Sequence, residues 1–360
     1  MRRTAALIVG GGPAGSAAAI RLARAGARPL LVERHADADA LCGGFVSWRT
    51  LDRIAALGVD ADTLNRDRLT RVTIFAGDRV REAALPRPAV GVSRRRLDTL
   101  LREAARRSGA AIETGVTVRH VEGLTAHLAD GTAITAEALF LATGKHDLRG
   151  LARPAAARGR DPTLGIRVRL SPAPALRRLL AGQIELHLFD RGYAGIALQE
   201  DGSANLCMAV HRSRLHDAGS PADLLAALGR ALPRLGERIA HLAPGASVDA
   251  IANVPYGWRQ RTGAAGLFRL GDQAGVIPSL AGEGMGIALA SGMQAADAWA
   301  TGGPAAAAAW QEGFARRLAR PMAVAGTVRR IAESRWSAPI VAMMPAALIQ
   351  VMAHATRMAP

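Results

Sequence analysis

The sequence is poor in cysteine and aromatic residues, and it lacks long apolar runs. Its only cysteines, Cys42 and Cys207, are too few for a disulfide framework or for a zinc site of their own. Aromatic residues amount to 4% of the 360, and no basic segment is interleaved with them, so we expect no nucleic-acid partner. The most apolar segment, 338–353, contains Pro345 and is too short to span a bilayer.

Arginine is present in excess. The formal net charge is +16, yet Lys145 is the only lysine among the 46 basic residues. At 49% hydrophobic residues, the chain is long enough for a well-buried core and two subdomains. We expect a cytoplasmic protein with reduced thiols and no signal peptide. Given this positive charge, binding of anionic ligands and peripheral contact with a membrane both stay open.

A strand, a glycine-rich loop and a helix follow one another at the start of the chain. Residues 5–9 form the apolar strand, Gly10-Gly11-Gly12-Pro13-Ala14-Gly15 the loop, and 16–25 have helical spacing. Such a loop brings backbone N–H groups and the positive end of a helix dipole to a pyrophosphate. Glu33 ends the next strand, where a carboxylate can accept both hydroxyls of an adenosine ribose. The unit predicts a dinucleotide site.

A second glycine-rich loop lies near residue 272. The segment 270–278 ends a strand at Asp272, and 281–286 leads into a long helix. Asp272 could hold ribityl hydroxyls, and the helix start could stabilise negative charge on a flavin. An N-capping role for Asp272 is the alternative.

The order of patterns predicts an α/β fold with four segments. Residues 1–150 contain alternating strands and helices, which predict the first part of a Rossmann-like FAD-binding domain. Residues 151–262 carry alternating strands that predict an inserted antiparallel substrate domain. Residues 263–300 return to the first domain, and 301–360 are expected to form C-terminal helices.

Three segments carry a resemblance to a known family. VGGGPAGSAAA with VER, SRRRLDTLL at 93–101, and GDQAGVIPSLAGEGMGIAL resemble the FAD-dependent aromatic hydroxylases and geranylgeranyl reductases over residues 1 to about 300. The resemblance implies that Arg94 reaches toward the pyrophosphate and that the loop holding Cys42 lies along the flavin. The two loops and the resemblance together predict these FAD-binding residues: Gly10, Gly12, Pro13, Ala14, Gly15, Glu33, Arg34, Cys42, Gly43, Gly44, Arg94, Val118, Gly144, Gly271, Asp272, Pro278, Gly282, Gly284 and Met285.

The chain departs from both branches of that family. Aromatic hydroxylases carry Ala-Asp-Gly where this chain has Ala142-Thr143-Gly144, so the electron donor stays open between NADPH and a separate reductase. Cys42-Gly43 resembles the Cys-Gly pair of geranylgeranyl reductases, but Tyr193 lacks the tryptophan that follows the tyrosine there.

Two residues are candidates for catalysis. Tyr193 begins a strand expected to face the flavin, where its hydroxyl could donate to a substrate oxygen; a packing role is the alternative. Lys145 follows a strand of the FAD domain and could face phosphate or flavin; a chance surface lysine is the alternative. No residues are spaced as metal ligands.

The resemblance implies an FAD-dependent monooxygenase that hydroxylates a lipophilic aromatic or polyketide-like small molecule with O2, through a C4a-hydroperoxyflavin. The first alternative is a flavin alkene reductase of the geranylgeranyl reductase type. The second is a flavin-binding module without catalysis. In either enzyme the flavin carries the chemistry, and the protein supplies orientation, electrostatics and exclusion of water. The oligomeric state stays open.

Overall fold

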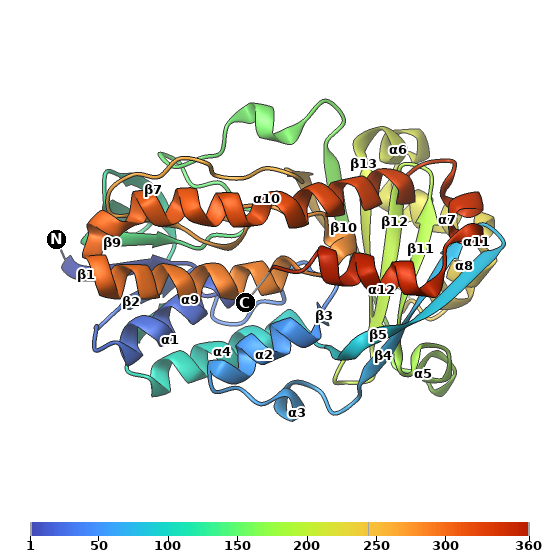
Figure 1. Ribbon diagram of the computed structural model, residues 1–360, viewed down its shortest axis with the longest axis horizontal. Helices are drawn as coiled ribbons and strands as arrows, with labels where there is room; N and C mark the ends of the chain where they lie inside the picture. Colours follow the sequence, from blue (N-terminus) through green and yellow to red (C-terminus); the bar gives the residue numbers. More distant parts are fainter. Residues whose placement is uncertain (1, 244, 359–360) are drawn as a thin grey trace.

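Two β-sheets lie side by side and the chain passes repeatedly between them, as the computed structural model of residues 2–243 and 245–358 shows (Figure 1). The first sheet has the order β6-β2-β1-β9-β8-β7, with β15 beside β9. Its strands are β1 (Arg2–Val9), β2 (Leu30–Glu33), β6 (Ala111–Thr114), β7 (Val118–Glu122), β8 (Thr125–Leu128), β9 (Ala133–Leu141) and β15 (Leu267–Arg269).

The first sheet is parallel at its centre and is covered on both faces. β1 pairs in parallel with β2 and β9, and β15 pairs in parallel with β9, whereas β7 and β8 form an antiparallel extension. Because side chains alternate along a strand, Ile8 joins one apolar cluster with the helices while Leu7 and Val9 join another. This is the predicted Rossmann-like half, and the expected α/β fold class is confirmed.

Helices α1 (Pro13–Arg24), α4 (Arg94–Arg107) and α9 (Gly284–Gly302) stand against the first sheet. The α1 and α9 backbones approach closely, because a Cβ on Gly292 would lie 2.2 Å from the carbonyl oxygen of Ala14. Helix α4 is capped at its start: the Ser93 hydroxyl accepts a hydrogen bond from the Arg96 N–H. Close packing therefore brings the start of α1 against the middle of α9.

The second sheet is mixed and has the order β14-β10-β13-β12-β11-β4-β5-β3. All its pairs are antiparallel except β4 with β11. Its strands are β3 (Phe45–Val46), β4 (Leu69–Ala76), β5 (Arg79–Gly91), β10 (Thr163–Leu170), β11 (Gln183–Phe189), β12 (Gly192–Leu198), β13 (Ala204–His211) and β14 (Asp249–Val254).

The structure differs from the predicted segment boundaries in this sheet. Residues 45–91 contribute β3, β4 and β5 to it, although the sequence groups them with 1–150. The hairpin of β4 and β5, which turns at Gly77, pairs through β4 with β11, which lies more than a hundred residues further on. Local patterns indicate that a segment is a strand but not which distant strand it joins.

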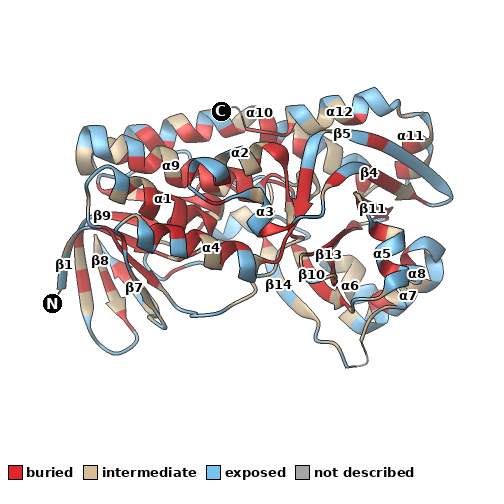
Figure 2. Cartoon of the chain, turned by 90° about the horizontal axis from the view of Figure 1, so that it is seen from below, coloured by how far each residue is buried: buried red, intermediate tan, exposed pale blue. Residues whose placement is uncertain are grey.

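Helices cover both faces of the second sheet. One face packs on the short helices α5 (Pro174–Leu180), α6 (Arg212–Ala218), α7 (Pro221–Ala231) and α8 (Pro233–Ile239). The other face packs on the end of α10 (Ala307–Ala332) and on α11 (Ser337–Met343) and α12 (Ala346–Ala355). Along β12, Ala194 and Ile196 face the first group and Tyr193 the second. Helices α2 (Trp48–Ala56) and α3 (Ala61–Leu64) complete the fold (Figures 1 and 2).

Among the described residues, no single helix is long and apolar enough to cross a membrane. The pair α11 and α12 passes on length and composition together, but its axis bends by 110° at the break.

Candidate functional site

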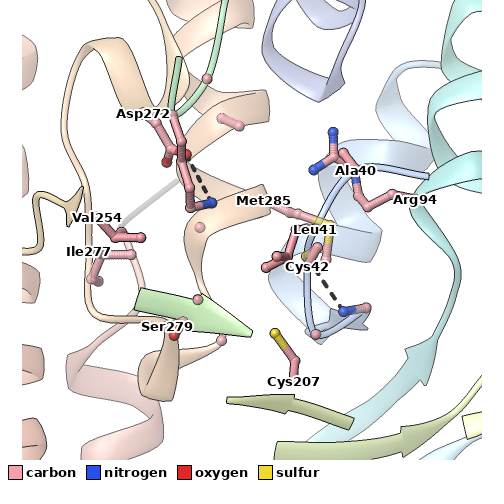
Figure 3. Close-up of a pocket in the computed structure, with 18 of the residues that line it drawn as sticks. Ala40, Leu41, Cys42, Arg94, Cys207, Val254, Asp272, Ile277, Ser279 and Met285 are labelled. Carbon is pink, nitrogen blue, oxygen red and sulfur yellow. Dashed lines mark hydrogen bonds and ion pairs between the residues drawn. The ribbon is translucent and has the colours of Figure 1, made fainter. Parts of the chain in front are cut away.

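A cavity of about 1000 Å³ lies between the two sheets, and residues of both sheets line it. Figure 3 shows part of its lining. One end is formed by the first glycine-rich loop and the end of β2, and the other by apolar side chains of β4, β11, α11 and α12. Its volume is at the upper end of the range for a single-ligand pocket, roughly 300–1,000 Å³. The cavity has room for a large cofactor and a substrate beside it.

The glycine-rich loop forms a cradle that side chains could not enter. Gly10 has φ +109°, and a Cβ there would lie 2.4 Å from the carbonyl oxygen of Ala142. A Cβ on Gly15 would lie 1.9 Å from the oxygen of Gly10, so this glycine permits helix packing as predicted. Gly12 starts α1 without a side-chain cap, which leaves the first N–H groups of the helix toward the cavity.

Glu33 lies at the end of β2 on the cavity wall, where the sequence places it. Its carboxylate accepts hydrogen bonds from the backbone N–H of Gly11 at 2.6 Å and of His35 at 3.0 Å. These bonds fix the orientation of the carboxylate and leave lone pairs for ribose hydroxyls. Arg34 and Val118 line the same end of the cavity.

Arg94 extends from the first turn of α4 to the glycine-rich loop. Its Nη2 atom would lie 3.2 Å from a Cβ on Gly12. Asp98 binds the guanidinium through two hydrogen bonds of 2.9 and 2.8 Å. Burial by itself would lower the pKa of Arg94, but the Asp98 carboxylate more than offsets this and raises the pKa. The guanidinium is therefore a fixed cation beside the predicted pyrophosphate position.

Lys145 and Asp272 form an ion pair on the cavity wall, with Nζ and Oδ2 3.2 Å apart (Figure 3). Attraction by Asp272 raises the pKa of Lys145 against the opposing effect of burial. The only lysine is thus partly buried at the second predicted loop. Two further residues, which the sequence analysis did not identify, join these loops: Arg153 donates to the carbonyls of Lys145 and Asp272, and Gln273 donates to that of Gly144.

Helix α9 starts at the cavity next to Asp272. Gly284 and Met285 line the wall, and the helix begins without a side-chain cap. A Cβ on Gly284 would have no atom within 4 Å, so the approach to this helix start is open. The partial positive charge of a 19-residue helix at this point suits a flavin ring edge that carries negative charge.

Both cysteines line the cavity, on the loop before β3 and on β13 (Figure 3). The Cys42 sulfur accepts a hydrogen bond from the Gly44 N–H at 3.5 Å. Burial raises the pKa of Cys207 to about 12. Cys207 therefore stays a neutral thiol, and it packs as a small apolar group.

The only two tyrosines meet at one serine in the cavity. The hydroxyls of Tyr193 and Tyr256 lie 2.5 and 2.7 Å from the Ser279 hydroxyl. Burial raises the pKa of both phenols, so both stay protonated at neutral pH. Three hydroxyl hydrogens serve two internal hydrogen bonds, which leaves one O–H group to donate to a ligand. The sequence analysis named Tyr193 but gave no indication of Ser279.

The end of the cavity away from the glycine-rich loop is apolar and is formed largely by the C-terminal helices. Ile349 and Met352 of α12, Val341 of α11 and Met344 lie against the sheet there. The sequence analysis left the role of this apolar tail open, and the structure places it on the cavity wall. All predicted FAD-binding residues line the cavity except Gly15, which packs α1, and Pro278.

These features fit FAD along the part of the cavity that runs from the first glycine-rich loop to the start of α9. Two uncapped helix starts, an oriented carboxylate and a fixed guanidinium occur in the order in which pyrophosphate, ribose and flavin need them. The fold and the site define the class: this is an FAD-binding protein.

Comparison with known proteins agrees with that class. A family model described as "FAD binding domain" matches residues 3–150. Menaquinone reductase of Mycobacterium tuberculosis is 32% identical over 242 residues, 61% of this chain and 57% of that protein. Chloroplastic geranylgeranyl diphosphate reductase of Arabidopsis thaliana is 32% identical over 120 residues, 32% of this chain and 25% of that protein. The chain thus matches less than two thirds of the length of either relative.

Solved structures share the fold over nearly the entire chain. A flavoprotein/dehydrogenase of Cytophaga hutchinsonii has a TM-score of 0.80 at 14% identity and covers 99% of this chain and 92% of that one. The probable FAD-dependent monooxygenase pqsL of Pseudomonas aeruginosa has a TM-score of 0.72 at 17% identity and covers 94% and 99%. The chain is thus similar in sequence to FAD-dependent oxidoreductases, and its cofactor is FAD.

Proposed function

We propose that the protein is an FAD-dependent monooxygenase that hydroxylates a lipophilic, oxygen-bearing aromatic or polyketide-like small molecule. One observation carries the proposal: the Tyr193–Ser279–Tyr256 hydroxyl cluster lines the cavity beside the apolar side chains of its far end, where the pocket continues from the flavin site. A pocket with one polar group and apolar walls selects a greasy molecule and fixes one of its oxygens.

The cofactor-binding residues would work as follows. Gly12 and the start of α1 would hold the pyrophosphate with Arg94, and Glu33 would bind the adenosine ribose. Asp272 would hold ribityl hydroxyls, with Lys145 balancing its charge. The start of α9 would stabilise negative charge at the pyrimidine edge of the flavin. When bound and reduced, the flavin would supply two electrons and react with O2. NADPH or a separate reductase would be the donor that reduces it.

The substrate end would act through position and proton supply. The free O–H of the hydroxyl cluster would donate to a phenol or carbonyl oxygen and keep the ring carbon beside the flavin. The apolar walls formed by Ile349, Met352 and Leu186 would exclude water from the reacting atoms. Overall, the substrate carbon gains one oxygen atom of O2, and the second leaves as water with two protons.

The test is a single-turnover reaction of the anaerobically reduced holoprotein with oxygenated buffer, with and without an alkylresorcinol. The proposal expects a product that contains one added oxygen atom, derived from labelled O2, and flavin reoxidation whose rate depends on the resorcinol. Reoxidation that yields only hydrogen peroxide with every phenolic lipid offered would contradict it.

A flavin alkene reductase is the second candidate, because both curated relatives described above are named reductases and the distal pocket is long and apolar. In that reaction the reduced flavin would supply hydride to a carbon–carbon double bond and the hydroxyl cluster would supply the proton. Anaerobic reoxidation of the flavin by a prenyl alkene, with no oxygen requirement, would identify this activity.

A further inference from the structure

Exposed large apolar side chains are concentrated in one region. Within residues 2–243 and 245–358, every such side chain belongs to the tip of the β4–β5 hairpin, the end of α10, the turn before α11, or α11 or α12 themselves. Met343 is 84% exposed, and Trp336 and Val351 are each 60% exposed. We call this set the C-terminal apolar surface; it consists of Val80, Ile331, Trp336, Met343, Leu348 and Val351.

The elements that carry this surface are joined to one another. Arg81 of the hairpin donates to the carbonyl of Val341 in α11 at 3.2 Å. Gln350 of α12 donates to the carbonyl of Ala84 in β5, also at 3.2 Å. Both views show α11 and α12 beside the hairpin and close to the end of α10 (Figures 1 and 2). The apolar side chains therefore lie on one continuous part of the molecule.

Helix α12 is apolar on two adjoining faces. Ile349 and Met352 line the cavity, whereas Leu348 and Val351 are exposed. The ten residues of the helix include no Asp, Glu, Lys or Arg. A surface helix normally turns a polar face to water, so an exposed apolar face indicates a partner that covers it.

The charges around this surface are mostly positive. Residues 321–360 include four arginines but only one acidic residue, Glu333, which is held by Arg329 and His211. Arg330 and Arg335 are exposed, and the Arg335 guanidinium lies 5.4 Å from the centre of the Trp336 ring. The hairpin adds exposed arginines and acids in equal number, namely Arg79, Arg81, Asp78 and Glu82.

We propose that the C-terminal apolar surface docks on a membrane that carries anionic lipids. Exposed tryptophan, methionine and leucine side chains with arginines beside them have the composition of an interfacial membrane contact. A symmetric contact with a second copy of the chain, with its twofold axis beside Trp336, would instead bring Arg330 and Arg335 close to the same arginines of the partner. Anionic headgroups complement this charge, and another copy does not.

Docking here would connect the bilayer to the cavity. Ile331 is both exposed and part of the cavity wall. Helix α12 likewise has one face on the cavity and another on the outer surface. A lipophilic substrate could pass between the end of α10 and α12 without entering water. This second step depends on the proposed function, whereas the docking itself does not.

Sedimentation of the full-length holoprotein with vesicles tests the docking. We expect binding to vesicles of phosphatidylcholine with phosphatidylglycerol, weaker binding to phosphatidylcholine alone, and loss of binding as salt is raised. The double variant Arg330→Gln/Arg335→Gln should bind the anionic vesicles about tenfold more weakly. The matched control, Arg106→Gln/Arg107→Gln, removes two exposed arginines from the end of α4 and should bind like the parent.

A second variant tests the apolar contribution. Met343→Ser/Leu348→Ser replaces two exposed side chains outside the cavity wall, so FAD content and thermal unfolding should stay unchanged while vesicle binding falls at least about tenfold. Absence of binding to either vesicle, or equal binding by parent and both variants, would overturn the proposal. So would a concentration-dependent dimer that the Met343→Ser/Leu348→Ser variant abolishes. Turnover of a soluble short-chain phenol is independent of vesicle binding, which separates failure of docking from failure of the proposed reaction.

Discussion

The two ends of the cavity are built in different ways. At the FAD end, Gly10, Gly12 and Glu33 lie within one strand–helix–strand unit, and the second loop follows one strand, β15. At the substrate end, the wall combines β4, β11, β12, α11 and α12, which are separated by up to about three hundred residues in the chain. The first end is a local motif, and the second exists only after the whole chain has folded.

This difference follows from what each end must recognise. A pyrophosphate needs backbone N–H groups and a helix dipole, which a short glycine-rich segment supplies by itself. An apolar substrate needs a shaped space, and shape arises from packing among remote elements. Substitutions at the FAD end should therefore act at once on cofactor binding, whereas those at the substrate end should act on stability, turnover or access.

The largest effect is expected from Gly10→Ala. The new Cβ would lie 2.4 Å from the Ala142 carbonyl oxygen at a left-handed φ, so we expect FAD binding to weaken about 100-fold or more. Fluorescence titration of the apoprotein with FAD measures this. The control is Gly26→Ala, which has a similar φ of +86° but no atom within 4 Å of the new Cβ. Equal FAD affinity of both variants would show that the close approach to Ala142 is unimportant.

The next effect concerns the ion pair that ties the chain end to the FAD domain. Glu283, before α9, is fully buried and lies 3.2 Å from the Nε of Arg357, with Arg53 also near. Arg357→Met removes one of the buried cations that balance the Glu283 carboxylate. It should therefore lower the free energy of unfolding by about 3–5 kcal/mol. Urea unfolding measures it. The double variant Glu283→Gln/Arg357→Met should recover part of the loss, and additive losses would contradict the pairing.

A smaller effect is expected at the hydroxyl cluster. Tyr193→Phe removes one member of the cluster while keeping the ring, so the turnover number should fall about 10–100-fold with FAD content unchanged. Steady-state kinetics on the substrate found by the single-turnover test measure this. Phe189→Leu, at the end of the adjacent strand and outside the cavity wall, serves as the control. An unchanged turnover number for both would assign Tyr193 to packing.

The smallest effect is a pH dependence of stability at His211. Its ring nitrogens contact Glu333 at 2.9 Å and Asp161 at 3.2 Å, while Arg329 lies 3.3 Å away and opposes protonation. The hydrogen bond with Glu333 raises the pKa of His211 above 6.5. The added stability is thus complete below about 6.5 and is lost as the pH rises through the raised pKa. Because the ring is partly exposed, we expect about 1 kcal/mol at most.

Thermal unfolding of the parent and His211→Gln at several pH values checks this. The melting temperature of the parent should exceed that of the variant at acidic pH, and the difference should shrink toward alkaline pH. A difference that grows with pH would show that the histidine is bound as the neutral form.

Several parts of the fold follow directly from the sequence. The first strand, the cap of α4 at Ser93 and the hairpin turn at Gly77 depend on neighbours along the chain, and the structure contains all three. The positions of Glu33 and Asp272 on the cavity wall also agree with the prediction, because Glu33 ends one strand and Asp272 comes shortly after another. Their contact with FAD itself stays a prediction.

Other parts could not be derived in this way. The pairing of β4 with β11 joins segments about 110 residues apart, and nothing in either segment specifies the other. Ser279 has no feature in the sequence that distinguishes it from other serines; it is important only because two tyrosines from β12 and from the segment after β14 reach it. Arg153, which joins the two cofactor loops, is one of many arginines in the chain.

The sequence by itself determined the cofactor and the class of protein, because phosphate recognition by glycine, helix start and carboxylate is complete within short segments. Only the tertiary structure decided that the apolar C-terminal helices form the wall at the apolar end of the cavity and leave another face exposed. The physical reason is that burial is a property of packing: the same apolar residues of α12 are core, cavity wall or surface according to what lies against them.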